Sequence, residues 1–526
     1  LPGVAFVHTA THACSKAGME EVRRVFGEQE PNRVVLAACS YRIVEKLYSH
    51  MFRQMGVHPG VLSVANLREA CLENAQGKGA GDPAARALLA QAVQEAWYGG
   101  FAPVVRETVE RTALVVGGGA SGLAAALRLA DLGHAVHLVE KEATLGGNLR
   151  TARYTVKGGA PGELLKDLES RVEAHPNVRV YTGAKVGAAQ GRLGAFRTEV
   201  ETKEGPVEVL HGAVALATGA GEVKPKIYGY GQSPKVVTQK ELEQKLAEGK
   251  LAGQKVVMIQ CVESREEAGG CRPYCSRVCC THAVKNALKL LETNPDAEVT
   301  VLYRDLRTYG AFEHRYREAR DKGVAFVPFD LAHRPMVEAQ RDAVSVRYTD
   351  PGLGQEVVET PDWLVLSAGM APDAEGNRRL AGLYGVKVDA HGFFVEKNPK
   401  AATTDFAKKG VYMAGLCHAP KHIEESLSQA GAAAARCSAL LAKGARRSLE
   451  KASYVVEKIC SRCGVCVDVC PYGARSLDLV DKQVAVVDPL LCEACGACTM
   501  ACPNKAAQQY GSAPKQVLMG LDELLG

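Results

Sequence analysis

The sequence predicts an α/β protein with two doubly wound dinucleotide-binding-type domains, an N-terminal α/β domain and a C-terminal two-cluster ferredoxin module. Three observations lead to this prediction: a glycine-rich turn between an apolar strand and an Ala/Leu-rich helix near residue 117, a second alternation of strands and helices from residue 255, and two runs of four cysteines near the C-terminus. A chain of 526 residues with 47% hydrophobic content is long enough for several such domains.

The glycine-rich turn predicts a dinucleotide site. Gly117, Gly119 and Gly122 match the pattern GxGxxG, whose glycines permit the turn, let the backbone approach a pyrophosphate and let the helix pack on the strand. The next predicted strand ends in Glu140, where an acidic residue would bind ribose hydroxyls. A turn that serves packing alone is the alternative. The expected contact residues are Gly117, Gly119, Ala120, Ser121, Gly122, Glu140 and Lys141.

Further segments favour FAD over NAD as the dinucleotide. Residues 142–147 resemble the FAD form of the motif, in which a glycine pair passes the flavin side of the dinucleotide. Residues 213–219 and 410–415 resemble motifs of flavin disulfide reductases, where an Asp usually follows the last glycine; here Leu416 and Cys417 follow, so this flavin contact is expected to differ. The added contact residues are Gly147, Asn148, Thr218, Gly219, Gly415 and Leu416.

A second doubly wound unit is expected after residue 250. Its elements are strands at 255–260, 298–303 and 324–327 and helices at about 280–293 and 312–322. Its first turn has no GxGxxG and is rich in cysteine instead. Ligands of open α/β sheets bind outside the carboxyl ends of the strands, so cysteine chemistry is expected where a nicotinamide nucleotide would otherwise bind.

The cysteines of this turn have three interpretations. Four of Cys261, Cys271, Cys275, Cys279 and Cys280 could ligate a third iron-sulfur cluster, and we take Cys261, Cys275, Cys279 and Cys280 as the ligands. A redox dithiol beside the flavin is the rival, because a thiol at a helix N-terminus is activated as a thiolate. Inert buried cysteines are the remaining alternative.

The C-terminal quarter carries the motif CxxCxxCxxxCP twice. Three thiolates at this spacing bind one 4Fe-4S cluster, and the fourth crosses to the other cluster. Zinc or disulfides are the alternative, but zinc sites usually show two CxxC pairs. The expected ligands are Cys460, Cys463, Cys466 and Cys502 for the first cluster, and Cys470, Cys492, Cys495 and Cys498 for the second.

Composition narrows the function classes. The net charge of +5 is small for this length, and no dense run of basic and aromatic residues suggests nucleic-acid binding. The sequence shows neither an uninterrupted apolar stretch of membrane-spanning length nor a secretory signal, so a cytoplasmic location is expected. In that reducing compartment, 18 cysteines are expected as metal ligands and redox thiols.

These motifs together resemble the flavin and iron-sulfur A subunit of heterodisulfide reductase, over nearly the whole chain. The most specific stretches are 257–288, 303–310 and the turn at 417–421. The resemblance implies FAD, a series of 4Fe-4S clusters, an anaerobic setting and flavin-based electron bifurcation in some members. It also implies partner subunits of a complex, with a hydrogenase, formate dehydrogenase or ferredoxin as electron partner and a possible dimer of complexes. Lys285 matches a lysine near flavin N5 and is the expected catalytic residue; a solvated helix charge is the alternative.

The N-terminal segment also matches this family through Cys14, Cys39 and Cys71, which are one ligand short of a fourth cluster. The family has a further cysteine region upstream, so the chain is expected to be truncated there. Some relatives insert another ferredoxin module in the FAD domain; the absence of cysteine between Cys71 and Cys261 makes this a short form and puts full bifurcation in doubt.

The expected domain order follows from these motifs. The chain is expected to begin with a cysteine-containing α/β domain (1–105), followed by the first part of the FAD domain (106–250) and the second Rossmann-like domain (251–365). The return of the FAD domain (366–448), the ferredoxin domain (449–512) and a tail (513–526) complete it. The predicted function is that of a flavin-dependent iron-sulfur oxidoreductase, working as one component of a complex. An NAD(P)H:ferredoxin oxidoreductase, a flavin-to-dithiol exchange protein and a silent electron conduit are the alternatives.

Overall fold

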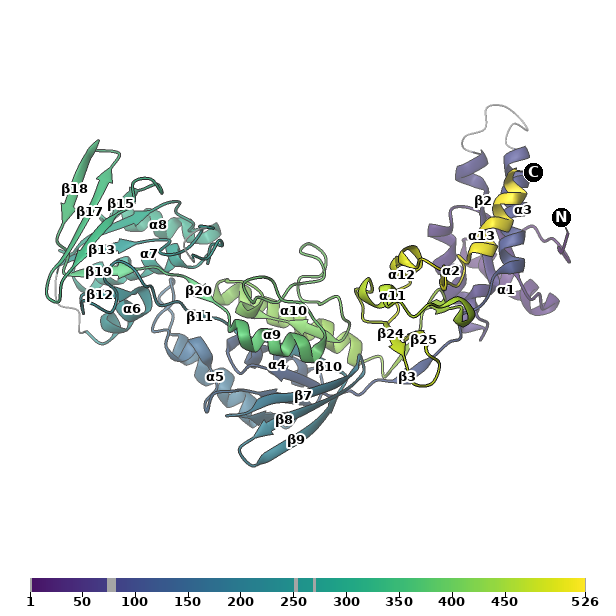
Figure 1. Cartoon of the computed structure of the whole chain (residues 1–526), viewed down its shortest axis with the longest axis horizontal. Coiled ribbons are helices and arrows are strands. Elements are labelled where there is room, and N and C mark those ends of the chain that lie inside the picture. The colour runs from purple at the N-terminus through teal and green to yellow at the C-terminus, as the bar shows by residue number, and fades with distance from the viewer. Residues whose placement is uncertain (1, 73–81, 250–253, 268–270, 526) are drawn as a thin grey trace. The chain divides into compact units, whose positions relative to one another are not determined.

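The computed structural model describes residues 2–72, 82–249, 254–267 and 271–525 (Figure 1). The chain forms two compact units. One comprises Leu1–Glu107 with Ala445–Gly526, and the other comprises Thr108–Gly444. Strands β3 (Arg106–Thr108) and β22 (Ala445–Arg447) lie where the chain passes from one unit to the other. Among the described residues, no helix has the length and apolar character needed to cross a membrane.

The larger unit begins with a five-stranded parallel sheet in the order β21-β10-β4-β5-β6. Helices α4, α5 and α10 pack on one face, where alanines of α4 and α10 let the two helices approach closely. An antiparallel meander, β7 to β9, contributes to the hydrophobic core on the other face. The elements are β4 (Ala113–Val116), α4 (Ala120–Asp131), β5 (Val136–Val139), α5 (Pro161–Ala174), β6 (Val178–Tyr181), β7 (Lys185–Arg192), β8 (Ala195–Thr202), β9 (Gly205–His211), β10 (Ala213–Leu216), α9 (Ala374–Tyr384), β21 (Val411–Met413) and α10 (Ile423–Leu441).

The same unit contains a second parallel sheet, ordered β12-β19-β13-β14-β15. Helices α6, α7 and α8 cover one face and the meander β16 to β18 the other. The strands and helices predicted for this domain are confirmed, and none of their ends differs from the prediction by more than one residue. The elements are β12 (Val236–Thr238), α6 (Gln239–Ala247), β13 (Lys255–Ile259), α7 (Cys279–Thr293), β14 (Glu298–Tyr303), α8 (Glu313–Asp321), β15 (Ala325–Pro328), β16 (Met336–Ala339), β17 (Val344–Asp350), β18 (Gln355–Glu359) and β19 (Trp363–Leu366).

Two extended segments connect these sheets. Strand β11 (Gly221–Glu222) leaves the first sheet and β20 (Met370–Ala371) returns to it, and the two pair antiparallel (Figure 1). The return places α9, β21 and α10 back on the first sheet. The predicted fold class, in which a first doubly wound domain is interrupted by a second, is confirmed.

The smaller unit combines the N-terminal residues with the C-terminal ferredoxin segment. Two parallel strands, β1 and β2, pack against α2 and α3, and α13 packs along α3. The segment expected as a tail therefore contains a helix that is part of this unit. The elements are α1 (Lys16–Gln29), β1 (Val34–Ala38), α2 (Tyr41–Gln54), β2 (Leu62–Asn66), α3 (Asp82–Tyr98), β23 (Ser453–Val455), α11 (Val465–Asp468), β24 (Arg475–Asp478), β25 (Val484–Val487), α12 (Ala497–Ala501), β26 (Ala507–Gln509) and α13 (Pro514–Leu525).

Candidate functional site

The glycine-rich turn between β4 and α4 is shaped for a phosphate group. Gly117 has φ +109°, a value that side-chain-bearing residues rarely adopt. A Cβ on Gly122 would lie 1.7 Å from the Gly117 carbonyl oxygen, so only glycine allows the helix to start this close to the strand. A Cβ on Gly119 would meet nothing within 4 Å. The backbone therefore faces open space in front of the α4 N-terminus, as pyrophosphate binding requires.

Glu140 lies at the end of β5, beside this turn. It is 8% exposed, and its carboxylate accepts hydrogen bonds from the Gly118 amide (2.5 Å) and the Glu142 amide (2.8 Å). It lines a cavity of about 990 Å³ together with Gly117, Lys141, Thr218 and Asn377 of α9. Glu140 therefore stands where the nucleoside half of a dinucleotide would lie.

A second cavity, of about 820 Å³, lies between the two sheets of this unit. Asn148 and Leu416, both predicted flavin contacts, line it from the first domain, and Lys285 and Cys279 line it from α7. Gly415, next to Leu416, has φ +81°, and a Cβ there would lie 2.2 Å from Ser121 Oγ. The structure therefore brings two of the predicted flavin contacts, Asn148 and Leu416, and the predicted catalytic lysine to one cavity, whereas Thr218 lines the cavity of Glu140.

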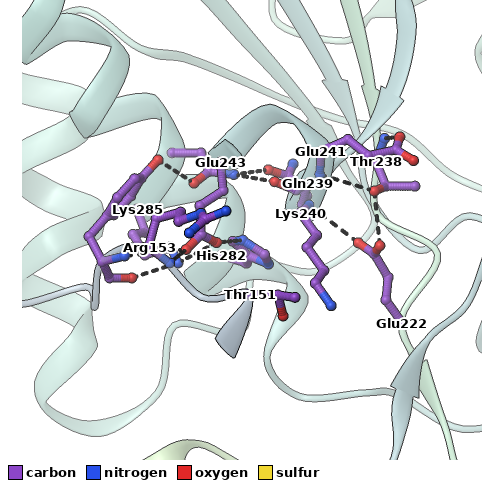
Figure 2. Close-up of polar contacts among 12 residues, drawn as sticks. Thr151, Arg153, Glu222, Thr238, Gln239, Lys240, Glu241, Glu243, His282 and Lys285 are labelled. Atoms are coloured by element: carbon purple, nitrogen blue, oxygen red, sulfur yellow. Dashed lines mark hydrogen bonds and ion pairs between the residues drawn. The ribbon is translucent and has the colours of Figure 1, made fainter. Parts of the chain in front are cut away.

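Lys285 belongs to a buried polar network centred on Glu243 of α6 (Figure 2). The Glu243 carboxylate accepts hydrogen bonds from Lys285 Nζ (2.8 Å), His282 Nε2 (2.7 Å) and the Arg153 amide (2.6 Å). Lys285 Nζ also donates to the Tyr154 carbonyl oxygen at 2.9 Å. The lysine is thus an oriented group on the cavity wall, with its side chain only 13% exposed, and it is not the solvated helix charge that was the alternative.

The Glu243 carboxylate is the acidic centre of this network, and two basic side chains face it. Burial would raise the pKa of Glu243, but the hydrogen bond and charge of His282 and the Lys285 ammonium outweigh it and hold the pKa at about 2. Burial lowers the pKa of Lys285, and Glu243 opposes that shift. The carboxylate is therefore ionised at neutral pH and fixes the positions of both basic side chains.

The cysteine-rich turn forms a third cavity in the larger unit, of about 330 Å³. Its lining includes Cys261, Cys275, Cys279 and Cys280, the four predicted ligands; Cys271 is absent from the lining residues. Cys261 follows β13, and the other three lie just before or at the start of α7. Four thiols around one enclosed space are the donor set that a 4Fe-4S cluster needs.

The backbone of this turn adopts costly conformations. Cys261, Glu263, Arg265 and Arg277 all have φ between +51° and +64°, although none is glycine. Such strain clusters at functional sites. Burial raises the pKa of the Cys261 and Cys279 thiols, and it raises the pKa of the Cys280 thiol to about 11.

The ferredoxin segment contains two cavities of about 350 and 330 Å³. The first is lined by Cys460, Cys463, Cys466 and Cys502, and the second by Cys470, Cys492, Cys495 and Cys498. Each set combines three cysteines of one run with the last cysteine of the other. Among the described residues, no three His, Cys, Asp or Glu side chains group around a single metal ion; the cysteines surround wider spaces.

Two of the three N-terminal cysteines lie where parallel strands end. Cys39 follows β1 and Cys71 lies in the turn after the parallel neighbour β2, so both stand at the carboxyl edge of this sheet. Cys14 precedes α1 and is exposed. A fourth cluster at these cysteines stays a prediction.

Two features of the sites were missed in the sequence. Glu243 had no motif to mark it, because its partners lie about 40 and 90 residues away along the chain. Arg475, which contacts Cys498, could have been found by aligning the two cysteine runs with each other.

Comparison with known proteins identifies two domains of this chain. Residues 115–177 match the family model of an NAD(P)-binding Rossmann-like domain, and residues 459–506 match that of a 4Fe-4S dicluster domain. These matches confirm the predicted dinucleotide-binding and two-cluster domains.

Relatives match over nearly the full chain. The second iron-sulfur A subunit of the CoB--CoM heterodisulfide reductase of Methanopyrus kandleri is 31% identical over 93% of this chain and 88% of its own length. The A subunit of the H(2)/formate:CoB-CoM heterodisulfide,ferredoxin reductase of Methanococcus maripaludis is 28% identical over 100% of this chain and 94% of its own. Among solved structures, Lactococcus lactis thioredoxin reductase is 18% identical with a TM-score of 0.46, covering 64% of this chain and all of that one.

Proposed function

The chain belongs to the family of heterodisulfide reductase iron-sulfur A subunits, and we propose that it binds FAD between the two sheets of its larger unit and passes electrons between that flavin and 4Fe-4S clusters. One observation carries the proposal: Cys279 lines both the cavity of Lys285 and Leu416 and the four-cysteine cavity. A carrier in one cavity would therefore be separated from a carrier in the other by a single residue.

The residues fit the two groups by their chemistry. Gly117, Gly119 and Gly122 would hold the pyrophosphate, Glu140 the ribose, and Asn148 and Leu416 the flavin side. Cys261, Cys275, Cys279 and Cys280 would ligate the adjacent cluster. FAD exchanges two electrons, whereas each cluster takes one, so the pairing converts one type of transfer into the other.

Within the flavin cavity, Lys285 is proposed to supply positive charge and a proton at Nζ. Glu243 accepts one hydrogen bond from this ammonium and the Tyr154 carbonyl oxygen accepts another, so a third donor remains on Nζ, which also lies 4.8 Å from the centroid of the Tyr154 ring. A donor of this kind stabilises a reduced, negatively charged acceptor by charge-assisted hydrogen bonding. His282 shares the same carboxylate and would keep Glu243 in place when Lys285 shifts.

The finer form of the proposal concerns partners. The relatives' names couple heterodisulfide to H(2), formate or ferredoxin, and we propose that this chain works with further subunits and with a hydrogenase, a formate dehydrogenase or ferredoxin as electron partner. We also propose flavin-based bifurcation, in which one of the two flavin electrons passes to a cluster at Cys261, Cys275, Cys279 and Cys280.

Anaerobic analysis of iron, acid-labile sulfide and flavin tests the core of the proposal. The full chain is compared with a variant carrying Cys275→Ser, Cys279→Ser and Cys280→Ser, and Cys271→Ser is the matched control because Cys271 is absent from the cavity lining. With four irons to a cluster, the triple variant should lose about four of at least about twelve irons, and the control should lose none. Equal iron content in all three proteins would contradict the third cluster and favour a thiol site.

A further inference from the structure

The two cysteine cavities of the ferredoxin segment are related by an internal repeat, and they differ at a few positions. Each cysteine of the first run has its counterpart 32 residues later, as Cys460 has Cys492. The backbone follows the repeat: the Ser453 amide donates to Cys492 Sγ at 3.3 Å, and the Ala485 amide, 32 residues later, donates to Cys460 Sγ at 3.4 Å. A third amide, that of Ala507, donates to Cys502 Sγ of the first cavity at 3.4 Å, so backbone donors reach the sulfurs of both cavities.

The main difference is Arg475, at the cavity of Cys470, Cys492, Cys495 and Cys498. Arg475 is 4% exposed and its Nη2 donates to Cys498 Sγ at 3.3 Å and to Ser453 Oγ. The repeat counterparts of Arg475 and Ser453 at the other cavity are Ala507 and Ala485. One cavity thus has a buried cation against a cysteine sulfur, and its twin has two methyl groups.

The remaining donors of Arg475 strengthen this contrast. Its Nε and Nη1 are buried without a hydrogen-bond partner among the described residues, although Arg475 lines the cavity. Buried polar groups nearly always have partners, and the sulfurs of a bound cluster are acceptors that could serve. The orphaned donors therefore fit a negatively charged group in this cavity.

We infer that Arg475 raises the reduction potential of the cluster at Cys470, Cys492, Cys495 and Cys498, so that this cluster takes the first electron of the ferredoxin pair. Positive charge and hydrogen bonds to sulfur both raise a cluster's potential, because reduction adds negative charge. The inference rests on the cluster ligands proposed above.

Other charges at the two cavities set the size of the effect. Glu493 lines the same cavity as Arg475 and opposes it, and one of its carboxylate oxygens is also buried. Arg475 differs from Glu493 in contacting a cysteine sulfur directly. Arg462 lines the twin cavity; it is exposed and donates to Gln483 Oε1 at 3.0 Å. The exposed charge of Arg462 is screened by water. Of the two buried charges, Arg475 has the larger effect on the cluster potential because it donates a hydrogen bond to a cysteine sulfur.

The test is a redox titration of the anaerobically purified full chain, followed by electron paramagnetic resonance. Cys463→Ser and Cys495→Ser assign the two signals, because each alters a ligand of one cluster only. Arg475→Gln should lower the equilibrium constant for reducing the Cys495 cluster about tenfold, which is about 59 mV for one electron. Arg475→Lys keeps the charge and should shift it less, Glu493→Gln should shift it the opposite way, and the control Arg462→Gln should change neither cluster appreciably.

Two outcomes would overturn the inference: the first electron of the wild-type pair entering the Cys463 cluster, or Arg475→Gln acting no differently from Arg462→Gln. If Arg475→Gln does not assemble its cluster, the order of reduction in the wild-type chain decides alone. A wild-type chain with too little iron for two ferredoxin clusters would instead contradict the proposed ligands.

Discussion

The four-cysteine cavity of the larger unit and those of the ferredoxin segment have nearly the same volume and donor set, yet they relate differently to their surroundings. In the larger unit, the cavity lies at the edge of a sheet whose two faces are packed by separate apolar cores. In the ferredoxin segment, Cys466, Cys498 and Cys502 are themselves core residues, packed with Ala485, Ala506 and Ala507. The proposed cluster site of the larger unit is added to a domain that has its own apolar core, whereas the cysteines of the two ferredoxin sites form part of the core around them.

The largest expected effect follows directly from this difference. Removal of iron with an anaerobic chelator should unfold residues 453–509, because ligand binding there supplies folding free energy that a small core cannot. The strands β4, β10 and β13 should stay folded. Amide hydrogen exchange by mass spectrometry reports both regions in one sample; equal loss of protection in both would break the comparison.

The second prediction concerns the ion network beside the cavity of the larger unit. Glu243→Gln leaves Lys285 and His282 buried without their carboxylate, and removing one partner of a buried ion pair typically costs about 3–5 kcal/mol. Urea unfolding of the larger unit should therefore shift to lower concentration. The chain has two tryptophans, and a Trp97→Phe background leaves Trp363 of β19 as the reporter of this unit.

A double variant, Glu243→Gln with Lys285→Met, should recover part of that loss, because it removes the uncompensated charge. An unchanged midpoint in the single variant would show that the network contributes nothing to the stability of the unit, and that the cavity wall is held by packing alone.

The same carboxylate predicts a pH dependence. Its folded pKa of about 2 lies below the ordinary value of 4.5, so the stability it contributes is present above pH 4.5 and is lost as the pH falls toward 2. The loss should be on the order of 3 kcal/mol. The Trp363 signal at several pH values measures it, and Glu243→Gln should flatten the profile; an equally steep profile in that variant would assign the dependence to other groups.

A smaller effect is expected from Arg265, which gives the larger unit its own arginine-sulfur contact. Arg265 Nη1 donates to Cys261 Sγ at 3.7 Å, longer than the 3.3 Å of Arg475 to Cys498, and it shares its charge with Asp305. Arg265→Gln should lower the reduction potential of the third cluster by less than about 59 mV, which corresponds to less than about a tenfold change in the equilibrium constant for its reduction. If Arg265→Gln shifted the potential of its cluster more than Arg475→Gln shifts that of the Cys495 cluster, the shorter arginine-sulfur contact would not be the stronger one.

The comparison also shows what sequence could and could not predict. The ferredoxin cavities follow from local spacing, because a motif repeated within 50 residues brings its own ligands together. At the other cavity, the four cysteines predicted from the sequence as ligands, Cys261, Cys275, Cys279 and Cys280, all line it, and the fifth cysteine of the segment, Cys271, does not. The Glu243 network joins segments from both sheets, and only tertiary packing determines such contacts.

Helix α13 was missed for the same reason. Its sequence has the apolar spacing of an amphipathic helix, but nothing local shows that α3 is its partner. The Gln516 side chain donates to the Glu95 carbonyl oxygen of α3, at a sequence separation of more than 400 residues. Contacts of this length have no signature in a single sequence.

The central claim is that a third cluster lies beside the flavin cavity, and an anomalous difference map recorded at the iron absorption edge from anaerobically grown crystals tests it most directly. We predict iron between Cys261, Cys275, Cys279 and Cys280, next to a flavin that contacts Leu416 and Lys285, in addition to iron at both ferredoxin cavities. Iron at the ferredoxin cavities with none at Cys261 to Cys280, in crystals that contain the flavin, would contradict it.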